Sequence, residues 1–308
     1  MRFVFAVLSA LSTSGCSLIY SAGIGLVYEG PELPDAQVIH DIRYLDGSDD
    51  PKHRLDLFLP TPDSVRAAPW PTVIFVHGGG WTEGDKDLAF GGVEVYGNIG
   101  RYFASRGIGA VTVNYRLLPG VAWLEQIEDV AAAVEWVGGQ VALYGGDPGA
   151  LFLMGHSAGA QLATHVALDP AALPETHAFG VCGVIAVSGA AYDLTDEETY
   201  ALSNDPAYYA RRFNPAGTDP DWQTDASPVR FASSDAPPFL IIYAGGESRA
   251  LQRQSRLLDA ALTDAGAEAD IVIVPGQSHE RIVLALSRDD ETAGPGMLGF
   301  ARGSECFE

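Results

Sequence analysis

The sequence predicts an α/β fold with a mostly parallel central sheet. Short, continuous apolar runs alternate along the chain with segments of helical length, and such runs are typical of strands that are buried on both faces. Two of the runs lead directly into glycine-rich turns, at residues 77–80 and 155–159. With 308 residues, of which 47% are hydrophobic, the chain is long enough to bury one large core.

The expected elements follow from the hydrophobic pattern. Residues 38–44 and 54–60 alternate apolar and polar positions, which predicts an antiparallel pair of edge strands. Buried strands are expected at residues 72–76, 108–113, 151–154, 181–187, 239–243 and 271–274. Helices are expected at residues 93–106, 123–137, 157–168 and 250–265. In the second of these helices, apolar residues recur at spacings of three and four, the pattern of one buried stripe.

Two segments break the alternation of strands and helices. Residues 192–235 are rich in Asp, Pro, Tyr and Arg without a clear period. We expect a loop insertion above the C-terminal edge of the sheet, where it would act as a small lid or pocket wall. Residues 291–308 are rich in glycine and polar residues and are expected to form a C-terminal tail on the surface. The sheet and its helices then occupy one domain, residues 36–290.

The N-terminus has the pattern of an export signal. A positive charge at Arg2 precedes an apolar stretch at residues 3–11 that is too short to span a bilayer. We expect residues 1–15 to be a signal peptide and residues 16–35 a linker, with the protein exported to a bacterial periplasm or anchored to a membrane. The small residues before Cys16 resemble a lipoprotein processing site. Lipidation of Cys16 and ordinary secretory cleavage nearby are both open.

Charge and cysteine content exclude several classes of partner. The chain has 18 basic and 40 acidic residues, a formal net charge of −22, which argues against nucleic acid and anionic membrane surfaces as electrostatic partners. No pair of cysteines has metal-ligand spacing, so we expect no structural zinc site. A disulfide between Cys182 and Cys306 would need an oxidising compartment, and the sequence leaves it open.

The turn at residues 155–159 has the sequence Gly-His-Ser-Ala-Gly. An apolar run followed by G-x-S-x-G and a helix-compatible segment is the pattern of a nucleophile elbow, a sharp strand-to-helix turn that exposes a serine. Cβ atoms at Gly155 or Gly159 would crowd such a turn. Ser157 is therefore the candidate nucleophile.

A serine hydroxyl needs a base within hydrogen-bond reach before it can attack a carbonyl. His279 lies in a turn-rich loop just after the last expected strand, and histidine suits this role because it titrates near neutral pH. An acid must then orient the imidazole. Glu247, which follows two glycines after the strand at residues 239–243, is the favoured candidate, and Asp193 is the alternative.

The developing oxyanion needs backbone N–H donors. Gly79 and Gly80, in the sequence His-Gly-Gly-Gly-Trp at residues 77–81, can bring bare backbone close to a substrate. Ala158 supplies a third N–H at the start of a helix, where the helix dipole also favours negative charge. His77 and His156 are expected to brace their loops through hydrogen bonds, and Trp81 to pack at the pocket floor.

With these motifs in the order strand, H-G-G-G, G-x-S-x-G, acid and histidine, the chain resembles the α/β-hydrolase esterases of the hormone-sensitive-lipase-like group. It is most similar to the branch that groups small carboxylesterases with arylformamidase-like proteins. Further matching pieces are Asn-Tyr-Arg-Leu at residues 114–117, Ser-Gly at 188–189, Tyr-Asp-Leu at 192–194, Gly-Glu-Ser at 246–248 and Arg-Gln-Ser at 253–255. The resemblance covers residues 38–286.

The resemblance implies an α/β-hydrolase fold without a large cap domain, with Ser157, Glu247 and His279 as the catalytic triad. It also implies Gly79, Gly80 and Ala158 as oxyanion donors, with no metal or cofactor. The family's acid is most often Asp, so Glu247 is a departure. The expected activity is hydrolysis of small carboxylic esters with short-to-medium acyl chains. The alternatives are hydrolysis of N-formyl amides and a catalytically silent exported binding protein.

Overall fold

The computed structural model describes residues 30–65, 68–90, 93–173, 180–289 and 293–303. The expected signal peptide, Cys16 and most of the expected linker lie outside the described residues. Within the described ranges, no helix is both long enough and apolar enough to cross a membrane. Cys182 is disulfide-bonded, while Cys306, the partner considered from the sequence, lies outside the described residues.

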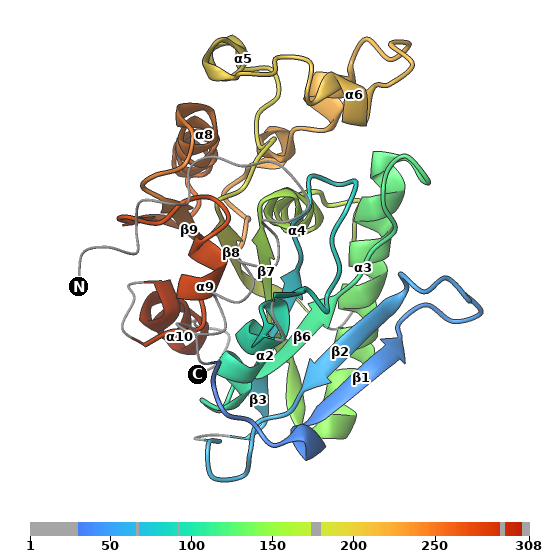
Figure 1. The fold of residues 1–308 in the computed structure, drawn as a ribbon, viewed down its shortest axis with the longest axis vertical. Helices are drawn as coiled ribbons and strands as arrows, with labels where there is room; N and C mark the ends of the chain where they lie inside the picture. The colour runs from blue at the N-terminus through green and yellow to red at the C-terminus, as the bar shows by residue number, and fades with distance from the viewer. Residues whose placement is uncertain (1–29, 66–67, 91–92, 174–179, 290–292, 304–308) are drawn as a thin grey trace.

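An eight-stranded, mostly parallel sheet forms the centre of the described chain (Figure 1). In spatial order, the strands are β1 (Val38–Arg43), β2 (Arg54–Phe58), β6 (Gly109–Val113), β3 (Trp70–Val76), β7 (Gly146–His156), β8 (Val181–Val187), β9 (Phe239–Ala244) and β10 (Ala269–Val274). Strand β2 runs antiparallel to both of its neighbours, and the remaining pairs from β6 to β10 are parallel. The predicted fold class and antiparallel edge pair are confirmed.

Helices cover both faces of the sheet, which explains why central strands such as β3 and β6 are buried at every position. In β3, the side chains of Ile74 and Val76 belong to one buried cluster, and those of Val73 and Phe75 to the other. The first cluster contains residues of α3 (Trp123–Gln140), α4 (Ala158–Leu168) and α8 (Arg249–Ala265). The second contains residues of α2 (Tyr96–Ala104), α9 (Ile282–Ala285) and α10 (Ala293–Gly303).

Two expectations from the sequence are wrong. The helix expected from residue 93 begins only at Tyr96, because β5 (Val93–Glu94) pairs with β4 (Ala89–Phe90) in a short antiparallel ribbon. The expected surface tail at residues 291–308 contains α10, whose Met297 and Ala301 are buried against the sheet. Its glycines and proline obscure an apolar stripe at helical spacing, so composition alone indicated a loop.

The insertion at residues 192–235 lies above the end of the sheet from which α4 departs, at the top of the view in Figure 1. It contains three short helices, α5 (Glu197–Leu202), α6 (Ala210–Phe213) and α7 (Trp222–Asp225), and a 3-10 turn, η3 (Pro228–Phe231). Two further 3-10 turns, η1 (Asp35–Gln37) and η2 (Val141–Tyr144), lie elsewhere in the chain.

Several contacts hold the insertion against the domain, and two of them involve its short helices α5 and α6. In α6, Phe213 packs edge-on against Trp81 with ring centroids 4.9 Å apart. Asp196, the N-cap of α5, accepts two hydrogen bonds of 2.7 Å from the guanidinium of Arg253 in α8.

Candidate active site

Ser157 lies at the sharp turn between β7 and α4. Its backbone has φ 56° and ψ −118°, a conformation that non-glycine residues rarely adopt and that is found at strained functional sites. The Ser157 N–H donates to the carbonyl oxygen of Val187 at 3.0 Å, which ties the turn to the end of β8. The strand-turn-helix expected of a nucleophile elbow is therefore present.

The two glycines of the motif have a steric role at this turn. A Cβ at Gly155 would lie 2.2 Å from the carbonyl oxygen of Gly159. A Cβ at Gly159 would lie 2.2 Å from the carbonyl oxygen of Val76 in the neighbouring strand. Because both obstacles are backbone atoms, no side-chain rotation relieves them, and only glycine allows α4 to approach the strands this closely.

The structure places His279 between Ser157 and Glu247. His279 Nε2 lies 2.8 Å from Ser157 Oγ, and His279 Nδ1 lies 3.1 Å from Glu247 Oε2. The Glu247 side chain is fully buried, whereas that of His279 is 21% exposed. A carboxylate only accepts hydrogen bonds, so Nδ1 carries the proton and Nε2 is left to accept the proton of the serine hydroxyl.

The loops that carry Glu247 and His279 are joined through their backbones. The N–H groups of Gly245 and Gly246 donate to the carbonyl oxygens of Val274 and Gln277, both at 2.9 Å. A Cβ at Gly246 would lie 2.8 Å from the Gln277 carbonyl oxygen, so glycine is needed here for close approach. These bonds fix the carboxylate and the imidazole relative to each other.

Asp193, the alternative acid, does not reach the imidazole through any hydrogen bond in the described structure. Its Oδ1 accepts from both the N–H and the hydroxyl of Thr195, at 2.9 and 2.7 Å. Its own N–H donates to Gln254 Oε1 at 2.8 Å. The geometry therefore favours Glu247 over Asp193 as the group that orients His279.

His77 and His156 are buried and brace the loops around Ser157, as expected from the sequence. Burial is the main cause that lowers the pKa of His77 to about 4 and that of His156 to about 3, so both imidazoles are neutral at neutral pH. Nδ1 of His77 donates to the Gly78 carbonyl oxygen at 2.7 Å. Nε2 of His156 donates to the carbonyl oxygen of His279 at 2.9 Å.

Gly79 and Gly80 form a tight turn beside the serine. Both have positive φ, 129° and 56°, and a Cβ at Gly79 would lie 1.9 Å from the Glu83 carbonyl oxygen. Within the described part of the chain, neither N–H donates to a protein acceptor. Ala158 is the first residue of α4, where the helix itself offers its N–H no carbonyl. These three groups can therefore serve as donors to a bound oxygen.

Sequence reasoning missed two polar side chains that fix this turn. Gln161 in α4 accepts a 3.0 Å hydrogen bond from Trp81 Nε1. Arg212 in α6 donates from Nε to the Gly80 carbonyl oxygen at 2.8 Å. Neither contact has a sequence signal, because the partners are far apart in the chain. Gln161 and Trp81 are 80 positions apart. Arg212 and Gly80 are 132 positions apart, and Arg212 lies in a segment without periodicity. Trp81 is buried, as expected for a packing residue.

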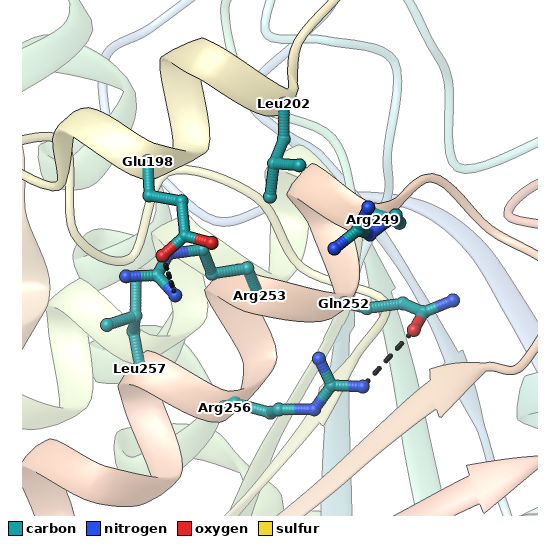
Figure 2. A pocket seen from close by; sticks show the side chains of 7 residues that line it. All are labelled: Glu198, Leu202, Arg249, Gln252, Arg253, Arg256 and Leu257. Atoms are coloured by element: carbon teal, nitrogen blue, oxygen red, sulfur yellow. Dashed lines mark hydrogen bonds and ion pairs between the residues drawn. The ribbon is translucent and has the colours of Figure 1, made fainter.

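A separate cavity of about 260 Å³ lies between α5 and α8 (Figure 2). It is lined by Glu198, Leu202, Arg249, Gln252, Arg253, Arg256 and Leu257. None of the candidate catalytic residues lines this cavity. Among the residues that the structure describes, no group of three or more His, Cys, Asp or Glu side chains is arranged to hold a metal ion.

The sheet order, the elbow and the serine–histidine–glutamate arrangement define an α/β-hydrolase. Residues 55–262 match the BD-FAE family, and the chain belongs to that family. The resemblance inferred from the motifs thus led to the correct fold class.

Curated relatives match most of this chain. Esterase LipQ of Mycobacterium tuberculosis is 33% identical over 268 residues, which is 84% of this chain and 60% of the relative. The probable isoprenylcysteine α-carbonyl methylesterase ICME of Oryza sativa subsp. japonica is 28% identical over 80% of this chain and 59% of its own length. The chain therefore spans about 60% of the length of these relatives.

Solved structures share the fold over nearly the whole chain. Esterase B from Lactobacillus rhamnosis, inhibited by a C4-C4 tributyrin phosphonate, has a TM-score of 0.74 at 24% identity, covering 94% of this chain and 92% of its own. The Pyrobaculum calidifontis esterase has a TM-score of 0.70 at 22% identity, covering 94% of this chain and 90% of its own. At these identities, the comparison establishes the fold alone.

Proposed function

We propose that this protein is a serine-dependent carboxylesterase that hydrolyses small carboxylic esters with short-to-medium acyl chains. The observation that carries the proposal is the continuous hydrogen-bonded path from Ser157 through His279 to the buried Glu247. The esterase names of the curated relatives support the reaction type. Esterase B, which shares the fold, is inhibited by a tributyrin phosphonate, and short acyl esters are therefore the first class to test.

In the proposed mechanism, Ser157 Oγ attacks the ester carbonyl carbon while His279 Nε2 accepts the hydroxyl proton. The carbonyl electron pair moves to oxygen, where the N–H groups of Gly79, Gly80 and Ala158 stabilise the negative charge. The bond to the alcohol then breaks, and His279 returns the proton to the departing alkoxide. Water repeats the sequence on the acyl-enzyme and releases the carboxylic acid. Glu247 stabilises the imidazolium in both halves of the reaction.

Replacing the nucleophile tests this proposal. Ser157→Ala is expected to lower kcat for 4-nitrophenyl butanoate by at least ~10³-fold, because triad members act as one unit. The measurement is steady-state kinetics on a series of 4-nitrophenyl esters from acetyl to dodecanoyl, with the optimum expected at short-to-medium chain length. Turnover by Ser157→Ala equal to that of the wild type would contradict the proposal, as would faster turnover of an N-formyl aryl amide than of every ester.

We also propose that the protein is exported and anchored through a lipid on Cys16. The support is the sequence pattern of residues 1–16, which lie outside the described residues. When the full chain is expressed in a bacterium with an alkyne fatty acid, the wild type is expected to incorporate the label and fractionate with membranes. Cys16→Ser is expected to do neither. Equal labelling of both forms, or of neither, would refute the lipid anchor.

A further inference from the structure

One side chain of the insertion is held directly against the glycine turn of the proposed oxyanion site. Arg212 Nε donates to the Gly80 carbonyl oxygen at 2.8 Å, and its Nη1 donates to the Tyr208 carbonyl oxygen at 3.1 Å. The guanidinium carbon also lies 3.5 Å from the centroid of the Tyr208 ring, in a cation–π contact. Three contacts thus fix the guanidinium in one position, and none of the described residues accepts a hydrogen bond from Nη2.

Two donor groups converge on the space beside the Gly80 Cα. A Cβ built on Gly80 would lie 2.6 Å from the Tyr208 hydroxyl oxygen and 3.6 Å from Arg212 Nη2. In the described structure, neither the hydroxyl nor Nη2 has a hydrogen-bond partner, and no described carboxylate forms an ion pair with Arg212. A side chain at Gly80 would collide with the Tyr208 hydroxyl, so glycine is what allows a hydroxyl and a positive charge to lie directly against the backbone of the turn.

The packing around these donors resists their displacement. Trp81 lies next to Gly80, and its ring is 6.4 Å from that of Tyr208 and 6.1 Å from that of Tyr209, measured between centroids. The Tyr208 and Tyr209 rings also meet edge to face at 5.3 Å. Tyr209 and Trp81 are buried, so the segment that carries the two donors rests on an ordered aromatic layer.

We propose that Arg212 and Tyr208 form a subsite for a carboxylate that the substrate carries within a few bonds of its scissile carbonyl. The inference rests on the proposed function, because it takes the N–H of Gly80 to bind the carbonyl oxygen. A guanidinium N–H and a phenolic O–H are both donors, and a carboxylate accepts from both. In a chain of net charge −22, a fixed cation beside the site selects an anionic substrate that the rest of the surface repels.

The carboxylate can belong to the acyl or to the alcohol portion, and paired substrates distinguish the two. The first pair is 4-nitrophenyl hydrogen succinate and 4-nitrophenyl pentanoate, which place a carboxylate or an ethyl group at the same position of the acyl chain. The second pair is O-butanoyl glycolate and propyl butanoate, which differ on the alcohol. The quantity compared is the ratio of kcat/KM for the anionic ester to kcat/KM for the neutral ester.

Removal of the charge is expected to change that ratio in one of the pairs. For Arg212→Gln, we expect a fall of about 10- to 100-fold, the range for losing a charge-assisted hydrogen bond. Tyr208→Phe, which keeps the ring under the guanidinium, is expected to lower the same ratio by a smaller factor. Arg211→Gln is the matched control, because Arg211 lies in the same short helix, is exposed and pairs with Asp205. Its ratio should equal that of the wild type.

The ratio separates this inference from the proposed function. If the wild type hydrolyses neutral esters but Arg212→Gln keeps the wild-type ratio in both pairs, the carboxylate subsite is refuted and the esterase proposal stands. An equal fall for charged and neutral esters refutes it too, since Arg212 then only positions Gly80. If the wild type hydrolyses none of the four esters, the proposed function itself fails.

Discussion

At the scale of single residues, the site depends on one carboxylate that is withdrawn from water. Glu247 has a fully buried side chain, and its Oε1 has no partner among the described residues, while Oε2 faces His279. An isolated buried carboxylate is costly unless it is compensated. In this site, the imidazolium formed during the reaction would supply that compensation, which argues that Glu247 has its main effect in the transition state.

Glu247→Gln is therefore expected to lower kcat by about 10³- to 10⁴-fold, because the amide cannot stabilise the imidazolium and favours the wrong tautomer. Asp193→Asn, the matched change at the alternative acid, is expected to reduce kcat by less than about 3-fold, a change in activation free energy of less than about 0.7 kcal/mol. Both variants are measured on the same neutral ester. Nearly full activity in Glu247→Gln together with a large loss in Asp193→Asn would transfer the acid role to Asp193.

The sequence identified the three residues that meet at the site and favoured Glu247 as the acid, but it did not exclude Asp193. Ser157 and His279 follow from motif and chain order, because each lies in a turn or loop just after an apolar run that is expected to be a strand. Glu247 and Asp193 each follow a strand as well, so order does not separate them. The two acids differ in their hydrogen bonds in the folded chain. Asp193 accepts from Thr195, whereas Glu247 accepts from His279.

At the scale of elements, the turn between β7 and α4 works only if the helix lies almost in contact with the strands. The carbonyl oxygen of Val76 occupies the place that a Cβ of Gly159 would take. Strain at Ser157 is thus maintained by backbone contacts on both sides of the turn. This explains why the motif requires glycine at two positions rather than any small residue.

Gly159→Ala is expected to lower the free energy of unfolding by about 1–3 kcal/mol, the cost of overpacking a close contact, and to lower activity through displacement of Ser157. Gly139→Ala is the matched control, because a Cβ there, in α3, meets no atom within 4 Å. It should leave stability unchanged or raise it by up to about 1 kcal/mol. Urea unfolding measures both, and equal stability of Gly159→Ala and the wild type would contradict the steric account.

Element prediction succeeded where burial makes the sequence uniformly apolar and failed where local composition conflicts with packing. The strand at residues 181–187 has the predicted bounds, since every position but its first is buried. Strand β7 begins at Gly146, five residues before the predicted start. Gly146 pairs with Trp70 of β3, and this pairing extends the strand through polar residues that the hydrophobic pattern does not mark. Helix α10 was missed because glycine and proline lower helix propensity, although tertiary burial of Met297 and Leu298 stabilises it.

At the scale of the whole molecule, burial keeps several histidines neutral, and stability should depend on pH as a result. Burial is the main cause that lowers the pKa of His77 to about 4, of His156 to about 3 and of His165 to about 4, from 6.5. Between these values and 6.5, the unfolded chain binds more protons than the folded protein. The free energy of unfolding must therefore fall as the pH falls through this window.

We expect a lower free energy of unfolding at pH 5.5 than at pH 7.5, measured by urea titration at constant ionic strength. His165→Gln should reduce the difference, because it removes one of the three imidazoles and lies in α4 outside the proposed catalytic groups. Equal stability of the wild type at the two pH values, or a higher value at pH 5.5, would contradict the assignment of these histidines as neutral in the folded protein.

The insertion at residues 192–235 combines a predictable position in the fold with side-chain contacts that the sequence does not predict. It lies above the sheet, contacts the glycine turn through Arg212, and packs on Trp81 through Phe213. Its position was predictable from its place between two strands and its lack of periodicity. Its contacts with Gly80 and Trp81 were not, because they join residues more than a hundred positions apart and no local pattern specifies them.

Covalent labelling tests the central claim most directly, namely that His279 and Glu247 make Ser157 nucleophilic. The wild-type protein is treated with a fluorophosphonate at neutral pH, digested, and analysed by mass spectrometry. The account predicts one adduct, located on Ser157, with labelling abolished in Ser157→Ala and strongly slowed in His279→Ala. An unlabelled wild-type protein that is shown to be folded, or an adduct on another serine, would contradict it.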